Sequence, residues 1–166
     1  DETRTFLAGG SKTSADEKQK QLYTTVLKGF LNGLNFEPNE NTTGFDLDSS
    51  VREIIDANKP EGFNFSHATG HGIGIPVHES PPKIGPSKVE TTSLKPNMCF
   101  TIEPGLYQEN FGGVRIENTV TITEKNNKKK IKTLTRAALD ENLINYNLLT
   151  DKEKKWLKEY QDFKIG

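Results

Sequence analysis

The amino-acid sequence predicts a single α+β domain. Its 166 residues are one domain's worth of chain, long enough to bury a core. Two segments with apolar residues at helical spacing lie in the first third, and short strand-like segments follow in the second half. Helices and strands do not alternate in the regular βαβ rhythm of a parallel sheet. Because no internal repeat or linker divides the chain, one mixed domain is favoured.

The first predicted elements are a strand end and a long helix. Residues 1–8 have the pattern of the end of a strand, and a turn is predicted at residues 9–11. Ser14 and Glu17 have the spacing of a capping box, which predicts a helix that continues to about Leu34. The apolar stripe of this helix has a 3.6-residue period and consists of Leu22, Tyr23, Val26, Leu27, Phe30 and Leu31.

The middle of the chain is predicted to contain one more helix and the clearest strands. The second helix runs from about Phe45 to Asn58, with Leu47, Val51, Ile54 and Ile55 on one face. Residues 80–97 are rich in Pro, Ser, Lys and Thr and are predicted to form a surface loop. The predicted strands are Met98–Ile102, Gly113–Thr123 and Ile131–Leu134. The last two are joined by a predicted hairpin turn, Glu124–Lys130, whose lysines are expected to be solvated.

The last predicted element is a helix near the C-terminus. Thr150 and Glu153 form a second capping-box pattern, which predicts that a helix begins there. Its apolar residues Trp156, Leu157 and Tyr160 are expected to pack on the body of the domain.

Composition excludes several classes of partner. The net charge of -1 gives no reason to expect binding to nucleic acid or to an anionic membrane surface. No apolar run in these residues approaches membrane-spanning length, and residues 1–8 do not have the pattern of a signal peptide. The single cysteine, Cys99, excludes an internal disulfide and fits a reducing, cytoplasmic compartment. We expect Cys99 to be a buried or half-buried strand thiol with no role in metal binding.

A short histidine-rich run and two isolated acids indicate a metal-dependent hydrolase. The chain has three histidines, and all of them lie in one glycine-rich run as His67, His71 and His78. Glu103 and Glu117 follow, each in an apolar, strand-like context. Imidazoles and carboxylates are the side chains that bind divalent metals and move protons near neutral pH.

The two glutamates are expected to lie side by side. A broad hairpin loop over residues 104–113 would bring Glu103 and Glu117 together on antiparallel strands. Two buried carboxylates repel each other unless a cation lies between them, and a bridging metal pair would also lower the pKa of a shared water. Mostly oxygen ligands with one nitrogen suit manganese, cobalt or zinc better than copper. Taken singly, each glutamate is more often an ordinary strand ion pair, for instance with Arg115, and each histidine more often structural.

Four spaced motifs occur in order along the chain: Asp1-Glu-Thr-Arg-Thr5, His71-Gly-Ile-Gly…His78-Glu, Thr101-Ile-Glu103-Pro-Gly and Arg115-Ile-Glu117. Together, they resemble those of the pita-bread metallopeptidases, the fold of methionine aminopeptidases, prolidases and aminopeptidase P. The resemblance spans essentially the whole chain and implies an incomplete pita-bread fold, with a curved antiparallel sheet and flanking helices.

Within that family the chain is most similar to aminopeptidase P. The motifs His67-Ala-Thr-Gly-His71 and Glu103-Pro-Gly-Leu-Tyr107 carry this similarity, and the tail over residues 149–157 resembles that of eukaryotic cytosolic Xaa-Pro aminopeptidases. In those enzymes the tail extends the catalytic domain and helps to form a homodimer. One departure is that His71 and His78 are closer together than in the animal enzymes and match the bacterial spacing.

The resemblance implies a role for each site residue. Asp1, His71, Glu103 and Glu117 would be ligands of two divalent metal ions, with manganese favoured and zinc or cobalt as alternatives. Asp1 and Glu117 would bridge the ions, and Glu103 would also shuttle the proton of the attacking water. The remaining roles fall to His78, which would stabilise the tetrahedral intermediate, His67, which would lie beside the substrate proline, and Arg115, which would hold the carboxylates in register.

The implied reaction removes the N-terminal residue from peptides with proline in second position, by attack of a hydroxide that bridges the two metal ions. Two alternatives remain open: a prolidase that cleaves Xaa-Pro dipeptides, and a non-catalytic pita-bread module that binds peptide or histone. The family pattern also has a companion aspartate before Asp1. Residues 1–166 are therefore expected to be the C-terminal portion of one catalytic domain, with a helical extension from about residue 150, and to be inactive alone.

Overall fold

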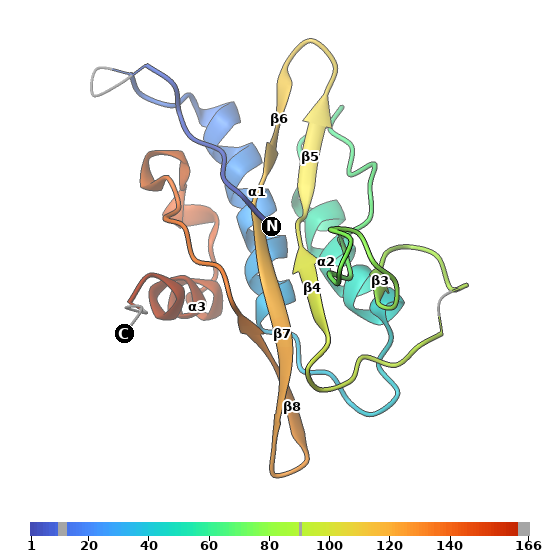
Figure 1. Ribbon diagram of the computed structural model, residues 1–166. Helices are drawn as coiled ribbons and strands as arrows, with labels where there is room; N and C mark the ends of the chain where they lie inside the picture. The colour runs from blue at the N-terminus through green and yellow to red at the C-terminus, as the bar shows by residue number, and fades with distance from the viewer. Residues whose placement is uncertain (10–12, 90, 163–166) are drawn as a thin grey trace.

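The computed structural model has the α+β architecture that the sequence predicts, with helices packed behind an antiparallel sheet (Figure 1). It describes residues 1–9, 13–89 and 91–162. The turn predicted at residues 9–11 therefore lies largely outside the described residues. Among the helices of the described residues, none combines the length and the apolar character that crossing a membrane requires.

The principal sheet has four antiparallel strands and is centred on the longest of them. This central strand is β7 (Glu117–Lys125), and β4 (Cys99–Ile102) pairs along one of its edges. The strands β1 (Glu2–Thr3) and β8 (Lys128–Thr133) both pair with β7 at different points of its length. The start of the chain thus lies beside β7, although more than a hundred residues separate the two in sequence (Figure 1).

Helix α1 (Glu17–Leu34) begins later than the sequence pattern predicts. Its N-cap is Asp16, whose side chain accepts a hydrogen bond from the Gln19 backbone nitrogen at 2.7 Å, while the Gln19 side chain accepts from the Asp16 nitrogen at 2.9 Å. The capping box predicted at Ser14 and Glu17 is therefore wrong. Because Asp16 with Gln19 satisfies the same local rule and stands two residues further along, the helix starts after it.

Helix α2 (Gly44–Asn58) packs against α1, and both lie behind the sheet (Figure 1). It begins one residue before the predicted Phe45, because Asp46 accepts hydrogen bonds from the backbone nitrogen and the hydroxyl of Thr43.

The final helix, α3 (Asp151–Asp162), follows two short 3-10 turns, η2 (Glu141–Leu143) and η3 (Tyr146–Leu148). The predicted capping box is present, since Glu153 accepts hydrogen bonds from both the nitrogen and the hydroxyl of Thr150. Leu157 is buried, and Tyr160 meets Phe30 of α1 edge to face.

Two small strand pairs replace two predicted loops. Within residues 80–97, β3 (Lys83–Ile84) pairs with β2 (Gly70–His71), and Ile84 is fully buried. The segment predicted as a broad loop after Glu103 forms the hairpin of β5 (Gly105–Gln108) and β6 (Gly112–Arg115). Glycine and proline weaken strand propensity in both segments, so the backbone pairing decides their structure.

The predicted strand Gly113–Thr123 is divided at Ile116. The nitrogen of Ile116 donates to the carbonyl of Pro104, and the chain then enters β7. At the far end, the turn between β7 and β8 is only Asn126-Asn127, and both residues have positive φ, 52° and 57°. Asparagine tolerates this conformation better than most residues. The lysine triplet 128–130 is accordingly part of β8 rather than of the turn.

The core lies between α1, α2 and the strands β4 and β7. Cys99 of β4 is half-buried, as predicted, and its lack of a metal role stays a prediction. The fully buried apolar side chains at the centre are Tyr23, Val26, Leu27, Phe30, Leu31, Leu47, Val51, Ile55, Phe100, Ile102, Ile116, Val120 and Ile122.

Candidate metal centre

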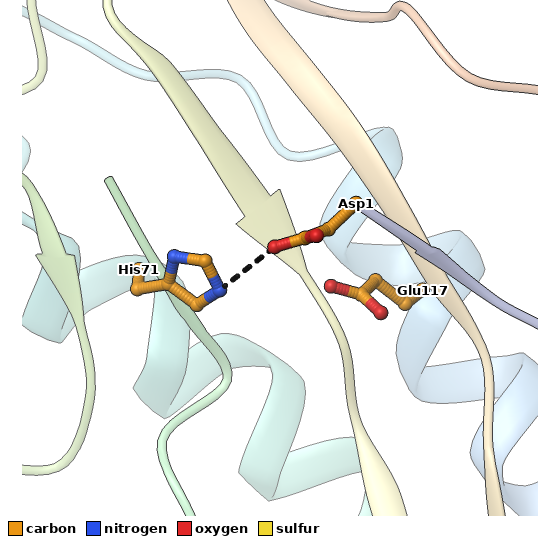
Figure 2. Close-up of side chains that lie close together, drawn as sticks. All are labelled: Asp1, His71 and Glu117. Atoms are coloured by element: carbon orange, nitrogen blue, oxygen red, sulfur yellow. Dashed lines mark ion pairs between the residues drawn. The ribbon is translucent and has the colours of Figure 1, made fainter. Parts of the chain in front are cut away.

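Three of the four predicted metal ligands converge at the side of the central strand. The ligand atoms of Asp1, His71 and Glu117 all lie within 4.8 Å of one another. Nε2 of His71 is 3.5 Å from an Asp1 carboxylate oxygen, and the Glu117 carboxylate lies beside that of Asp1 (Figure 2). Glu117 is almost completely buried, whereas Asp1 is exposed.

Glu103, the fourth predicted ligand, approaches the same imidazole nitrogen of His71 as Asp1 does. Its Oε1 is 3.6 Å from Nε2 of His71. In the antiparallel pairing of β4 with β7, Ile102 is opposite Asn118, so Glu103 follows at the level of Glu117. Burial, together with the neighbouring charge of Glu117, raises the pKa of Glu103. The expected closeness of the two glutamates is therefore present, although the hairpin β5–β6 rather than a loop joins their strands.

These residues fit a divalent cation. The carboxylate oxygens and one imidazole nitrogen form the hard, oxygen-rich donor set that such ions prefer. The Nδ1 atom of His71 lies 3.0 Å from the carbonyl of Gly72, which can only accept. Nδ1 therefore carries a proton, and Nε2 is the nitrogen that faces the carboxylates, which is the ring orientation of a metal-ligating histidine. A cation would also relieve the repulsion that raises the pKa of Glu103.

Short contacts between β1 and β7 hold the two acids of this centre. The Thr3 hydroxyl donates to the Glu117 carboxylate, and the Thr119 hydroxyl contacts both the nitrogen and the carbonyl oxygen of Asp1 at 2.8 and 2.7 Å. The Arg4 guanidinium donates to the Glu117 carbonyl at 2.6 Å and to the Tyr160 hydroxyl at 2.7 Å. Arg4 thereby connects helix α3 to the strand that carries Glu117.

The position of His71 depends on a close approach of β2 to β4. A Cβ on Gly70 would lie 1.9 Å from the carbonyl oxygen of Thr101, so only glycine allows the two backbones to come so near. The His71 nitrogen donates to the Thr101 hydroxyl at 3.0 Å, and that hydroxyl is 3.3 Å from Glu103 Oε1. The same threonine thus contacts two predicted ligands.

His67 belongs to a hydrogen-bonded chain with Tyr107 and Arg115. Its Nδ1 is 2.7 Å from the carbonyl of Ala68, and its Nε2 is 2.9 Å from the Tyr107 hydroxyl. Burial lowers the pKa of His67, which favours the neutral ring with its proton on Nδ1. Nε2 then accepts from Tyr107, whose oxygen accepts from Nε of Arg115 at 2.8 Å.

The remaining predicted residues, His78 and Arg115, line an open pocket of about 460 Å³ together with His67, His71 and Glu103. Arg115 pairs with Glu103 at 3.9 Å, as predicted, and the rings of His71 and His78 are 3.9 Å apart between centroids. Sequence reasoning assigned no role to Tyr107, although it stands in a motif used for the family resemblance. It also gave no role to Lys83, which lines this pocket.

Comparison with known proteins agrees with this geometry. The model of metallopeptidase family M24 matches residues 1–124. The chain is 34% identical to a probable Xaa-Pro aminopeptidase P of Ajellomyces capsulatus, over 96% of the chain and 27% of that protein. It is 42% identical to an Xaa-Pro dipeptidase of Pyrococcus furiosus, over 80% of the chain and 36% of that protein.

Among solved structures, the chain is similar to an X-prolyl aminopeptidase of Caenorhabditis elegans, described as a cytosolic enzyme with a di-nuclear active site. The TM-score is 0.80 at 31% identity, over 89% of the chain and 25% of that structure. The chain thus spans about a quarter to a third of the length of these relatives. A family match over residues 1–124, in a fold that carries the clustered acids and histidine, establishes that the chain belongs to metallopeptidase family M24.

Proposed function

We propose that this chain is part of a metal-dependent Xaa-Pro aminopeptidase, which removes the N-terminal residue from peptides whose second residue is proline. The observation that carries the proposal is the convergence of Asp1, His71 and Glu117 within 4.8 Å, with Glu103 3.6 Å from the same imidazole. Such a centre suits hydrolysis of an amide, because it combines ligands for a cation with a carboxylate that can accept a proton.

Asp1, His71, Glu103 and Glu117 would hold two divalent ions, in keeping with the di-nuclear active site of the related Caenorhabditis elegans enzyme. The oxygen-rich donor set favours manganese, with zinc or cobalt as alternatives. Bound ions would lower the pKa of a water molecule so that it becomes a nucleophile near neutral pH. An aspartate from the segment before Asp1 would complete the ligand set, so residues 1–166 would be the C-terminal portion of the catalytic domain.

The chain's own residues would supply proton transfer and substrate binding. Glu103 is suited to accept the proton of the attacking water, because its carboxylate lies at the centre, 3.6 Å from Nε2 of His71. His78 would donate a hydrogen bond to the oxyanion of the tetrahedral intermediate from its place beside His71. His67 would contact the substrate proline, and Arg115 would hold Glu103 in orientation.

The aminopeptidase is favoured over a prolidase by the extent of the similarity. The match to the Ajellomyces protein covers 96% of the chain, so it extends well into the segment after residue 124, where the family model ends. Helix α3 belongs to that segment and contacts the site region through Tyr160 and Arg4. The higher identity to the Pyrococcus dipeptidase, 42%, is the observation that keeps the prolidase as a second candidate.

Two further properties belong to this proposal. The protein would act in the cytoplasm, in agreement with the single cysteine and with the description of the related structure as cytosolic. It would form a homodimer in which the extension from about residue 150 takes part, and peptides with penultimate proline would be its partners.

The test is peptide cleavage by the intact protein loaded with manganese. A tripeptide Xaa-Pro-Xaa, the dipeptide Xaa-Pro and a tripeptide with alanine in second position are compared, with His71→Ala as the inactive control. We expect release of the first residue from the proline tripeptide. Cleavage of the dipeptide alone would favour the prolidase, and peptide binding without any cleavage would favour the non-catalytic module.

A further inference from the structure

A buried ion pair on helix α2 is directed at the segment that carries His67 and His71. The Asp48 side chain is 1% exposed, and its Oδ2 accepts a hydrogen bond from Nε of Arg52 at 2.7 Å. Its other oxygen accepts two hydrogen bonds from Thr69, from the hydroxyl at 2.7 Å and from the backbone nitrogen at 3.2 Å. A carboxylate of helix α2 is thus bound to the residue that lies between the two histidines.

Arg52 binds the same segment on the other side of Thr69. One terminal nitrogen of its guanidinium donates to the carbonyl of Phe65 at 3.0 Å, and the other donates to the carbonyl of His67. The guanidinium carbon lies 4.0 Å from the centre of the Phe65 ring, and that ring meets the His67 imidazole edge to face. Residues 65–69 are therefore held by both members of the ion pair.

Thr69 also connects the ion pair of Asp48 and Arg52 to Glu103, another predicted ligand. Its carbonyl accepts a hydrogen bond from the Glu103 nitrogen at 2.7 Å, and Thr69 is itself fully buried. Thr69 is thus hydrogen-bonded to Asp48 through its hydroxyl and nitrogen and to Glu103 through its carbonyl. Helix α2 is in this way connected by hydrogen bonds to the backbone of two predicted site residues, His67 and Glu103, and through Thr69 to the segment that continues to His71.

We propose that Asp48, Arg52 and Thr69 are positioning residues, which together set the orientation of His67, His71 and Glu103 toward the metal centre. The planar guanidinium is needed because it donates to Asp48 and to two carbonyls at once, which an ammonium group cannot do in that geometry. The proposal rests on the proposed function only in its effect on catalysis. Its structural content, that this cluster orients the two imidazoles, stands independently of the substrate.

A cluster that only anchored a loop to a helix would affect stability and nothing else. The chain offers a matched control for this alternative at the start of α3. Glu153 is also buried, accepts hydrogen bonds from the nitrogen and the hydroxyl of Thr150 at 2.7 and 2.9 Å, and pairs with Lys28 at 3.8 Å. It shares the chemistry of Asp48, but the threonine that it binds lies at the start of helix α3 and not in the segment that carries the histidines.

The experiment compares Asp48→Asn and Thr69→Val with Glu153→Gln in the intact protein. Two readouts are measured: the histidine ring resonances in NMR spectra without metal, and the affinity and visible spectrum of added Co²⁺. We expect Asp48→Asn and Thr69→Val to shift the His67 and His71 resonances and to weaken Co²⁺ binding about tenfold or more, the effect typical of residues that orient metal ligands. Glu153→Gln should leave both readouts unchanged, whatever its effect on thermal stability.

The proposal is overturned if Thr69→Val and Asp48→Asn lose thermal stability to the same degree as Glu153→Gln while ring resonances and Co²⁺ spectra stay as in the wild type. Should Asp48→Asn fail to fold, Thr69→Val decides alone, because it removes one hydroxyl and leaves the ion pair in place. Absence of Xaa-Pro cleavage by the wild-type protein would defeat the proposed function. The NMR comparison does not depend on peptide cleavage, so it would still decide the positioning role.

Discussion

The hydroxyl of Tyr107 lies 2.9 Å from Nε2 of His67 and accepts a hydrogen bond from Nε of Arg115 at 2.8 Å, so it joins the imidazole to the guanidinium. The three residues come from different elements, the loop before β2, strand β5 and strand β6. Arg115 also pairs with Glu103 at 3.9 Å. These contacts therefore connect His67, which is expected to bind the substrate proline, with Glu103, which is expected to shuttle the proton.

The first prediction concerns that hydroxyl. Tyr107→Phe keeps the ring but leaves Nε2 of His67 and Nε of Arg115, both half-buried, without their partner, at a cost of roughly 1 kcal/mol. We expect kcat/KM on an Xaa-Pro tripeptide to fall about tenfold or more. Tyr146→Phe, at an exposed position, is the control. Equal kinetics for the two variants would remove Tyr107 from the site.

The second prediction concerns the pH dependence of stability. Burial lowers the pKa of His67 below its ordinary value of 6.5, so the unfolded state binds the proton more readily than the folded state. The contribution of His67 to the free energy of unfolding is therefore present above about pH 6.5 and is lost as the pH falls through the lowered pKa. In urea unfolding of the metal-free protein, the free energy of unfolding of His67→Gln should decrease less steeply over that pH window than that of the wild type. An identical pH profile in the variant would contradict the buried, neutral ring.

The third prediction separates catalysis from folding at Arg115. Arg115→Ala removes the partner of Glu103 and of Tyr107, so a buried charge at the centre loses its counter-ion. Turnover should fall at least about tenfold, with a smaller effect on thermal stability than on rate. Lys132→Ala, on the exposed face of β8, serves as the comparison. Unchanged turnover in Arg115→Ala would mean that this residue is only part of the strand.

The fourth prediction concerns the backbone beneath His71. Gly70→Ala places a Cβ 1.9 Å from the Thr101 carbonyl oxygen, so β2 must move away from β4 and carry His71 with it. We expect the affinity for Mn²⁺ to fall about tenfold or more, as measured by isothermal titration. Gly85→Ala, where the nearest side-chain atom is 3.3 Å away, is the control and should bind Mn²⁺ nearly as the wild type does. Normal metal affinity in Gly70→Ala would mean that the close approach is not needed.

Long elements with strong periodicity could be predicted from the sequence. The apolar stripe of Leu22, Val26 and Phe30 predicted helix α1, and the box at Thr150 and Glu153 predicted the start of α3. The first capping box was misplaced because Ser14–Glu17 and Asp16–Gln19 satisfy the same local rule. Local chemistry alone does not distinguish two such boxes that overlap.

The short strands could not be predicted, because tertiary pairing creates them. Strand β2 is only Gly70–His71, and the hairpin β5–β6 contains three glycines and follows Pro104. These residues disfavour strands intrinsically, so the pattern predicts a loop. Their structure comes from partners distant in sequence, such as Ile84 opposite Gly70.

The cluster of acids around His71 could be predicted, but the buried ion pair of helix α2 behind it could not. His71, Glu103 and Glu117 stand out because acids and imidazoles are unusual in apolar, strand-like segments. Asp48 and Arg52 have the i, i+4 spacing of an ordinary solvent-exposed helix pair, and nothing local marks Asp48 as buried. Its burial follows from the docking of α2 against residues 65–69, which the sequence does not reveal.

The central claim is that Asp1, His71, Glu103 and Glu117 hold the metal. Its most direct test is anomalous diffraction at the manganese edge from crystals of the intact protein soaked in Mn²⁺. We predict a peak within ligand distance, roughly 2.0–2.3 Å, of Nε2 of His71 and of the Glu117 carboxylate, and its loss in His71→Ala. An ion bound elsewhere, or a peak that persists undiminished in His71→Ala, would contradict this claim.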